Sequence, residues 1–478
     1  MGQAVAGQTG ARQTGAGQTG AGQAKFVEGN LLRHVTVMSL SASVGLMAIF
    51  VVDLINMVYI SWLGDPDLTA AIGYAGAVMF FTTAIGIGLS IGVTVLVAQA
   101  VGARNAGLAR QRATIGLVLG GALGVAFTGV VWLLLPQIVD LIGARGRTGV
   151  EALNFLRIYT VSQPLLIVAI LGAAILRAYG EARRAMMVTV WGAIALAALD
   201  PVLILWLDME LTGAAIAGAG SRMVMLAVAL WPVWRRIGGF APVTRAAMAD
   251  FLRPFVAISA PAILTQMATP VGQAIVTRMV GVYGEPAVAG MAIAGRLTPV
   301  AFAVIFALSG ALGPIVGQNL GAGRMDRVAR VFRDSIIFTA VVIGTVSLAL
   351  FVFRAPLADL FRAEGQTRDL VYLFCGPLSL LFFFNGLIFV SNALCNNLGR
   401  PFWSTAVNWG RHTLGTLPPA LWLGGMLGAQ GVLIGQAVGG IVFGLIAVWM
   451  GWYAIRHPRG PIARPLHAAE AVPGEGPV

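Results

Sequence analysis

Long apolar runs separated by short polar stretches fill most of the 478-residue chain. We count twelve of these runs between Val35 and Tyr453, and charged residues gather at their ends. At about 1.5 Å per residue in a helix, each run is long enough to cross the roughly 30 Å hydrocarbon core of a bilayer. A membrane β-barrel would instead alternate apolar and polar residues along each strand, and these runs do not. The pattern predicts an all-α integral membrane protein with twelve transmembrane helices.

The twelve runs form two related sets of six. Residues 88–111, GLSIGVTVLVAQAVGARNAGLARQ, align with residues 307–330, ALSGALGPIVGQNLGAGRMDRVAR, so that Gln99 meets Gln318. Six runs repeated in the same order and the same orientation indicate a parallel repeat, related by an axis along the membrane normal. We therefore predict two six-helix bundles that form a central cleft, which is the route expected for alternating access.

The repeat and the polar stretches divide the chain into five parts. The GQTGA-rich start and the Pro-rich end lack the apolar residues that a folded core needs, and both are predicted to be disordered. The predicted boundaries are 1–30 for the N-terminal tail, 31–236 for the N-terminal lobe, 237–250 for a cytoplasmic linker, 251–455 for the C-terminal lobe and 456–478 for the C-terminal tail.

The formal net charge of +12 comes mainly from arginines at the ends of the apolar runs. Aromatic residues do not interleave with them in a basic patch, so the charge does not indicate a nucleic-acid partner. The loops after even-numbered runs carry most of these arginines, for example Arg104, Arg110, Arg112, Arg183 and Arg184. By the positive-inside rule, these loops and both termini are predicted to be cytoplasmic, in a multi-pass protein of the lipid bilayer.

Two carboxylates interrupt the apolar runs of the N-terminal lobe. Asp53 lies in the first run and Asp200 in the fifth, about 16 Å and about 12 Å below the outer ends, so the two lie at similar depth. Asn56 shares a helix face with Asp53. An ionised carboxylate at this depth costs a few kcal/mol unless it is paired, protonated or bound to a cation. We predict that Asp53, Asn56 and Asp200 form a coupling site for H⁺ or Na⁺. The alternative is that they only join helices through hydrogen bonds.

The C-terminal lobe has no such pair of carboxylates. Polar residues within the runs are candidates for lining a substrate cleft, namely Gln163, Gln266, Gln273, Arg296, Asn385 and Asn392. The alternative for these side chains is helix packing, and for the mid-run Arg411 and His412 we favour a structural role. No metal-ligand spacing, nucleotide-binding motif or nucleophile motif occurs. We therefore expect no cofactor and no enzyme activity, and active transport would have to draw on an ion gradient.

Several motifs together resemble the multidrug and toxic compound extrusion (MATE) transporters. They are LTPVAFAVIFALSGALGPIVGQNLGAGR at 297–324, WLGDPDLTAAIG at 62–73, LDPVLI at 199–204, GAAIAGAGSR at 213–222 and NNLGRP at 396–401. The resemblance is to the bacterial branch related to DNA-damage-inducible transporters. It implies export of cationic or amphipathic small molecules in exchange for H⁺ or Na⁺. We expect a monomer in the bacterial inner membrane.

The chain departs from the family pattern around the predicted coupling site. The family has its span-one Asp where this chain has Asn56, and it often has Asn and Thr where this chain has Leu196 and Gly218. Because Na⁺ needs several oxygen ligands and H⁺ needs only a carboxylate, these departures favour H⁺. Two other readings are less well supported. A lipid-linked precursor flippase would usually have fourteen spans and a strongly cationic cavity, whereas this chain has twelve runs with few arginines in their middle. A membrane-embedded enzyme would need a clustered acid-base or metal site, and the sequence shows none.

Overall fold

The structure is a computed structural model that describes residues 24–62 and 65–458. Within these residues the regular elements are all helical. The N-terminal half contains α1 (Leu31–Trp62), α2 (Pro66–Gly102), α3 (Ala106–Leu141), α4 (Gly146–Val161), α5 (Gln163–Ala178), α6 (Ala182–Asp200), the π-helical segment η1 (Pro201–Trp206) and α7 (Glu210–Arg236).

The C-terminal half continues the series. It contains α8 (Arg245–Gly281), α9 (Glu285–Ala301), α10 (Ala303–Gly321), α11 (Met325–Val352), α12 (Arg354–Leu360), α13 (Gly365–Leu373), η2 (Phe374–Leu378), α14 (Ser379–Asn397), α15 (Pro401–Gly410), η3 (Arg411–Gly415) and α16 (Leu417–Arg456).

The predicted all-helical membrane fold is confirmed. Ten helical segments of the described chain are long and apolar enough to cross a membrane, and α4 with α5, bent by 47°, make an eleventh. One of the ten, Pro401–Arg456, has 56 residues and is broken at Gly428, where φ is 63° and ψ is −143°. The two parts pack antiparallel, because a methyl group on Gly431 would meet Leu423 O and one on Gly435 would meet the backbone of Ala420. Dividing this segment at Gly428 gives the twelve predicted crossings.

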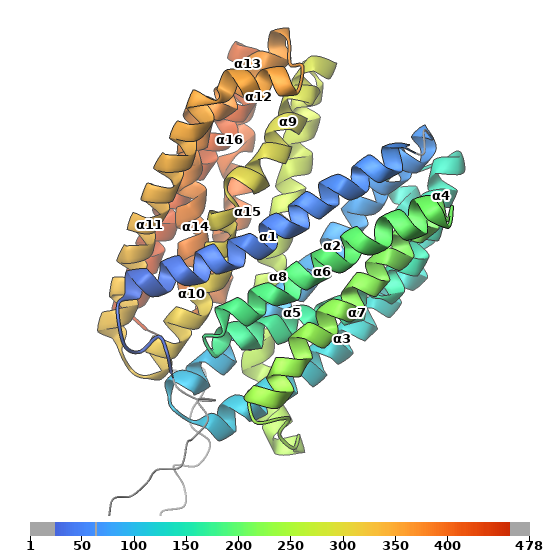
Figure 1. The fold of residues 1–478 in the computed structure, drawn as a ribbon. Helices are drawn as coiled ribbons and strands as arrows, with labels where there is room; N and C mark the ends of the chain where they lie inside the picture. Colours follow the sequence, from blue (N-terminus) through green and yellow to red (C-terminus); the bar gives the residue numbers. More distant parts are fainter. Residues whose placement is uncertain (1–23, 63–64, 459–478) are drawn as a thin grey trace, which may run out of the picture.

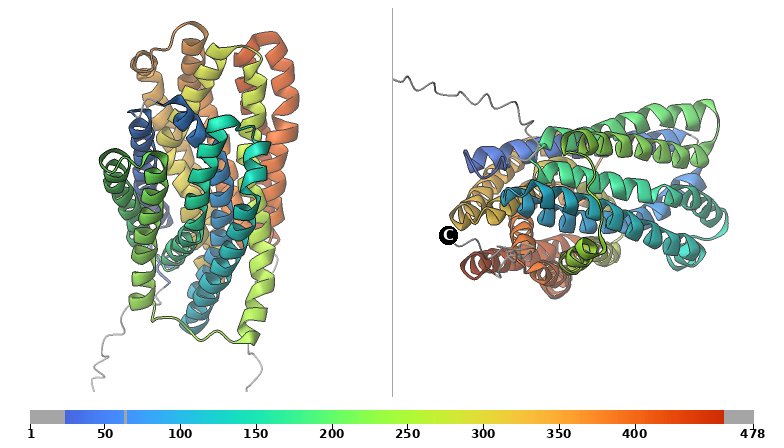
Figure 2. Two further views of the ribbon diagram at one scale, coloured as in Figure 1. Left: turned by 90° about the vertical axis from the view of Figure 1, so that its right-hand side faces the viewer. Right: turned by 90° about the horizontal axis from the view of Figure 1, so that it is seen from below.

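The helices gather in two groups. Figures 1 and 2 show α2 to α7 on one side and α9 to α16 on the other, with the two groups converging toward the lower end of Figure 1. Helix α1 runs between the groups and packs against both α6 and α10, while α8 packs along α2. The groups therefore meet through a small number of helices, which is the arrangement that rigid-body movement of one group against the other requires.

The two copies of the sequence repeat cross one another where the groups meet. Gly102 ends α2 against the carbonyl of Gln318, and a methyl group at Gly102 would lie 2.0 Å from that oxygen. Gly321 ends α10 in the same way, and a methyl group at Gly321 would lie 2.0 Å from Gln99 O. Glycine allows this close approach of two backbones because it has no Cβ. We call this region, formed by residues 99–102 and 318–321, the closed end.

The segment before α1 covers the closed end, which corrects the predicted tail boundary at residue 30. Phe26 is only 3% exposed, and its amide donates to Gln318 Oε1 at 3.0 Å. Arg327 Nη2 donates to Phe26 O at 3.0 Å, and Lys25 pairs with Glu181 Oε1 at 2.5 Å. Residues 24–30 are thus part of the fold and touch both helix groups. The remainder of the predicted tails, residues 1–23 and 459–478, lies outside the described residues.

Candidate functional site

A buried hydrogen bond joins the first span to the fifth. Asn56 Nδ2, on α1, donates to Asp200 Oδ2 at 2.8 Å. Asp200 is the last residue of α6 and is 0% exposed, and Asn56 is half-buried. A bond between an amide donor and a carboxylate is charge-assisted and stronger than a neutral one. The sequence analysis compared the depths of Asp53 and Asp200 and added Asn56 by its shared helix face, and the structure places Asn56 in contact with Asp200. The coupling role of these residues stays a prediction.

The chain just after Asp200 is irregular for a clear reason. Pro201 has no amide hydrogen, so the carbonyl four residues before it loses its helical donor. The helix widens into the π-helical segment η1 at this point. Gly213 at the start of α7 lies against it, since a methyl group there would meet Leu203 O at 2.6 Å. Such π-helical turns are frequent at functional sites, and this one places Asp200 at the end of a regular helix.

The third predicted member of the coupling site is Asp53. It lies in α1 one turn before Asn56, but its side chain is outside the described residues. Leu196 and Gly218, the two departures noted from the sequence, contribute no side-chain oxygen. Within the described residues, the pair supplies one carboxylate and one amide, and the choice between H⁺ and Na⁺ stays a prediction.

A second polar cluster, which the sequence analysis missed, surrounds Arg222 of α7. Arg222 is 3% exposed, and its Nη1 donates to Tyr159 O at 2.8 Å and to Ser162 Oγ at 2.6 Å. Its guanidinium lies 3.6 Å from the centroid of the Tyr159 ring, a cation–π contact. These partners sit at the 47° bend between α4 and α5, where helical bonding is interrupted. The signal in the sequence was a lone arginine midway along an apolar run.

Gln163, a predicted cleft residue, begins α5 directly after this bend. It is 1% exposed, and neither of its amide atoms has a partner among the described residues. It does not join the bond between Asn56 and Asp200. A buried amide without partners is costly and calls for a water or a ligand group. The predicted role of Gln163 in substrate contact stays a prediction.

The candidates of the C-terminal half lie on three helices. Gln266 is half-buried and Gln273 exposed on α8, Arg296 is exposed on α9, and Asn392 is half-buried on α14. Asn385, also on α14, has a contact of its own, because its Oδ1 accepts a hydrogen bond from Arg411 Nη1. Arg411 opens the π-helical segment η3, and its Nη2 donates to His412 Nε2 at 2.5 Å. The structure thus pairs one predicted residue, Asn385, with an arginine to which the sequence analysis gave a structural role.

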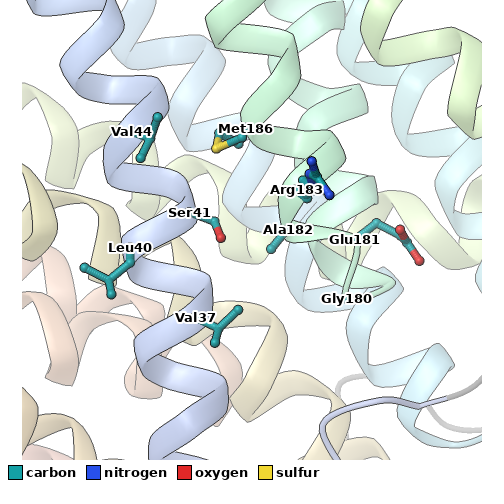
Figure 3. A pocket seen from close by; sticks show the side chains of 9 residues that line it. All are labelled: Val37, Leu40, Ser41, Val44, Gly180, Glu181, Ala182, Arg183 and Met186. Carbon is teal, nitrogen blue, oxygen red and sulfur yellow. The ribbon is translucent and has the colours of Figure 1, made fainter.

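A groove on the outer surface does not belong to either cluster. Figure 3 shows it between α1, which contributes Val37, Leu40, Ser41 and Val44, and the start of α6. Its apolar members are well exposed, Leu40 by 47% and Val44 by 53%. Ser41 lies about 22 Å along α1 from Asn56. The groove is therefore separate from the bond between Asn56 and Asp200.

These features define a class of protein. Twelve apolar crossings in the described chain, two helix groups that meet at one end, and a buried carboxylate between two spans are typical of a secondary transporter.

Comparison with known proteins gives the family. The MatE family model matches residues 35–202 and 261–419, and the chain belongs to this family of secondary transporters. The FAD transporter of Shewanella oneidensis is 28% identical over 420 residues, which cover 86% of this chain and 92% of that protein. The probable multidrug resistance protein NorM of Thermotoga maritima is 23% identical over 77% of this chain and 78% of that protein.

Solved structures show the same fold. The crystal structure of a mutant of the Vibrio cholerae MATE transporter VcmN superposes with a TM-score of 0.85. The match has 23% sequence identity and covers 89% of this chain and 97% of that chain. The fold resemblance found in the sequence motifs is therefore confirmed.

Proposed function

We propose that the protein is an antiporter that exports small molecules in exchange for H⁺, with Asp200 as the group that carries the proton. The observation that supports this proposal is the hydrogen bond from Asn56 to the fully buried Asp200, which ties the first span to the fifth. Protonation of Asp200 removes the charge that this bond satisfies, and so changes how strongly α1 and α6 are held together. Such a change is what coupling a proton to a conformational equilibrium requires.

The experiment compares wild type with Asp200→Asn in energised everted vesicles. Ethidium efflux is followed separately under a pH gradient and under a Na⁺ gradient. We expect efflux driven by the pH gradient in the wild type and its loss in Asp200→Asn. Asp208→Asn, which removes an exposed carboxylate beyond the end of η1, serves as the control. Efflux by Asp200→Asn at the wild-type rate would refute the coupling role of Asp200. Wild-type efflux driven by the Na⁺ gradient and not by the pH gradient would identify Na⁺ as the coupling ion.

A second candidate substrate class is the flavin nucleotides. The similarity to a protein named as a FAD transporter covers most of both chains. Arg222 and Arg411 are among the arginines that place positive charge within apolar spans, which favours an anionic substrate. Flavin efflux from the same vesicles, measured by fluorescence, separates the two classes. Efflux of FAD without efflux of ethidium would make the flavin nucleotide the substrate and exclude the organic-cation class.

The remaining predictions concern placement. We propose that residues 31–236 and 251–455 act as the two lobes, that both termini are cytoplasmic in the bacterial inner membrane, and that the DNA-damage-inducible branch is the nearest subgroup. The arginine-rich loops support this orientation. With this orientation the closed end is the cytoplasmic end, so the structure corresponds to an outward-open state.

Labelling of single cysteines introduced at Arg104 and at Arg147, from each side of the membrane, tests the orientation. The flippase alternative predicts movement of a lipid-linked precursor instead of ethidium or FAD.

A further inference from the structure

Arg411 holds a positive charge near the middle of a span. It lies about 15 Å along the helix from Pro401, which begins the span, and the apolar core is roughly 30 Å thick. An arginine at the centre of a membrane helix costs about 2.5–3.5 kcal/mol on insertion scales, and such residues mark substrate pathways or pair with other groups. Arg411 also opens η3, a π-helical turn inside the span. A charge in this position calls for a partner.

The partners of Arg411 are neutral. Its guanidinium donates to Asn385 Oδ1 and to His412 Nε2. A guanidinium has no acceptor, so the accepting Nε2 of His412 must carry a lone pair and the ring is the neutral tautomer with its proton on Nδ1. Among the described residues, Arg411 forms no ion pair with a carboxylate. The cluster of Arg411, Asn385 and His412 therefore keeps a full positive charge uncompensated.

The cluster lies inside the C-terminal bundle. Asn385 belongs to α14, and no residue from 381 to 400 in or just after this helix is exposed, because α10, α11, α15 and α16 surround it. His412 is 3% exposed and sits against Gly272 of α8, where a methyl group would lie 1.9 Å from Nδ1. Arg411 itself is only partly covered. Its guanidinium reaches an interior helix.

Aromatic rings border the same face of α14. Phe382 and Phe389 stand three residues before and four residues after Asn385, so they share its helix face. Phe382 stacks on Phe302 with ring centroids 4.3 Å apart, and Phe306 lies against both Phe382 and Phe389. An interior site with one uncompensated guanidinium and adjoining aromatic rings suits a ligand that has both an anionic group and a ring system.

We propose that Arg411, held by Asn385 and His412, binds the phosphate of an anionic aromatic substrate such as a flavin nucleotide. This inference rests on the proposed transport function and adds a substrate class and a recognition residue to it. Arginine suits this task because its planar fork of donors matches two phosphate oxygens. The neutral partners orient the guanidinium without cancelling its charge. A cationic substrate gains nothing from this group and is repelled by it.

The test measures binding of FAD, FMN and riboflavin to the purified full-length protein by flavin fluorescence. The three probes share one ring system, and riboflavin alone lacks phosphate. Two variants act on the charge in different ways. Arg411→Gln removes it, while Asn385→Asp is nearly isosteric and places a carboxylate against the guanidinium. Arg278→Gln, which removes an exposed arginine near the end of α8, is the matched control.

We expect wild type and Arg278→Gln to bind FAD and FMN more tightly than riboflavin. Both Arg411→Gln and Asn385→Asp should weaken FAD and FMN binding about tenfold or more, the scale of one charge-assisted contact, and leave riboflavin unchanged. If Arg411→Gln does not fold, Asn385→Asp still tests whether the charge of Arg411 binds the phosphate. Wild-type FAD affinity in a folded Asn385→Asp protein, or equal wild-type affinity for FAD and riboflavin, would overturn the inference. Ethidium efflux driven by a pH gradient would then still stand as a separate result for the transport function.

Discussion

Gln99 and Gln318 are equivalent residues of the internal repeat, and each donates its side-chain amide to the backbone of the opposite helix group. Gln99 Nε2 reaches Asn397 O at 3.3 Å, and Gln318 Nε2 reaches Ala178 O at 2.7 Å. The two acceptors are themselves one repeat apart. The closed end is thus held by two equivalent hydrogen bonds, one from each half of the repeat. Each of these two hydrogen bonds joins one helix group to the other, so both depend on contact between the groups.

The first prediction concerns the glycines that permit this closure. In Gly102→Ala, the new methyl group would lie 2.0 Å from Gln318 O, which is closer than real Cβ contacts occur. A clash of even a few kcal/mol shifts a two-state equilibrium by more than about tenfold. We expect transport to fall at least about tenfold while the protein still inserts and folds. Alkylation of Cys395, which is 3% exposed and two residues from Asn397, should become faster.

Gly310→Ala is the control for this experiment. It lies in α10, the helix that ends at Gly321, and a methyl group there meets nothing within 4 Å. Its transport and its Cys395 alkylation should match the wild type. Normal transport by Gly102→Ala would mean that the closed end is not a step of the cycle.

The sequence predicted the helices and the repeat because both depend on local patterns. Apolar run length predicts a crossing without knowledge of its neighbours, and Gly428 marks the division of the last long segment by a conformation that only glycine readily adopts. The alignment of Gln99 with Gln318 was also visible. Their bonds to Ala178 and Asn397 were not, since these depend on how two whole groups of helices dock.

Part of the candidate site could also be predicted from the sequence, and part could not. Counting depth along two helices was enough to suggest that residues near Asp53 and Asp200 meet, and Asn56 does contact Asp200. Arg222 was overlooked because its partners are a backbone carbonyl and a serine hydroxyl at a bend between α4 and α5. The pattern of polar residues in a sequence does not show which backbone carbonyls lose their helical donors at a bend. The role of Asn385 likewise depends on where Arg411 points.

A second prediction tests the segment that covers the closed end. Arg327 is 8% exposed and donates to Asn319 Oδ1 and to the carbonyls of Phe26, Glu28 and Gly29. Arg327→Gln removes the Nε donor of Asn319 Oδ1, a buried acceptor, at a cost of about 1–3 kcal/mol for a group that water cannot reach, and it also loses the bonds to the exposed carbonyls of Glu28 and Gly29. We expect a lower midpoint of thermal unfolding in detergent and faster tryptic cleavage after Lys25.

The control is Arg330→Gln, which makes the same change of charge at an exposed position one turn further along α11. It should leave both the midpoint and the cleavage rate near those of the wild type. Equal protection of Lys25 in wild type and Arg327→Gln would show that the segment is held by other contacts.

A third prediction concerns the turn between the last two crossings. Gly428 has φ of 63° and ψ of −143°, a combination that residues with a Cβ rarely adopt, at a cost of about 1–3 kcal/mol. Gly428→Ala should lower the thermal midpoint and the yield of folded protein. Gly425→Ala, at a helical glycine with nothing within 4 Å of the added methyl, should have no such effect. Equal stability of the two variants would contradict the division of the segment at Gly428.

The last prediction separates a coupling role of the Asn56–Asp200 pair from a purely structural one. Asn56→Ala removes the amide that donates to Asp200 Oδ2 at 2.8 Å and leaves the buried carboxylate with one donor fewer. A hydrogen bond to a charged group contributes about 1.5–3 kcal/mol, which corresponds to roughly 10- to 100-fold in an equilibrium. If this bond stabilises the ionised form during the cycle, transport driven by a pH gradient should slow by that range. Exchange of labelled for unlabelled substrate without a gradient needs no net proton movement and should stay near the wild-type rate. Asn154→Ala, at an exposed position of α4, is the matched control and should affect neither. If Asn56→Ala slows driven transport and exchange equally, the pair holds helices together and does not couple the proton.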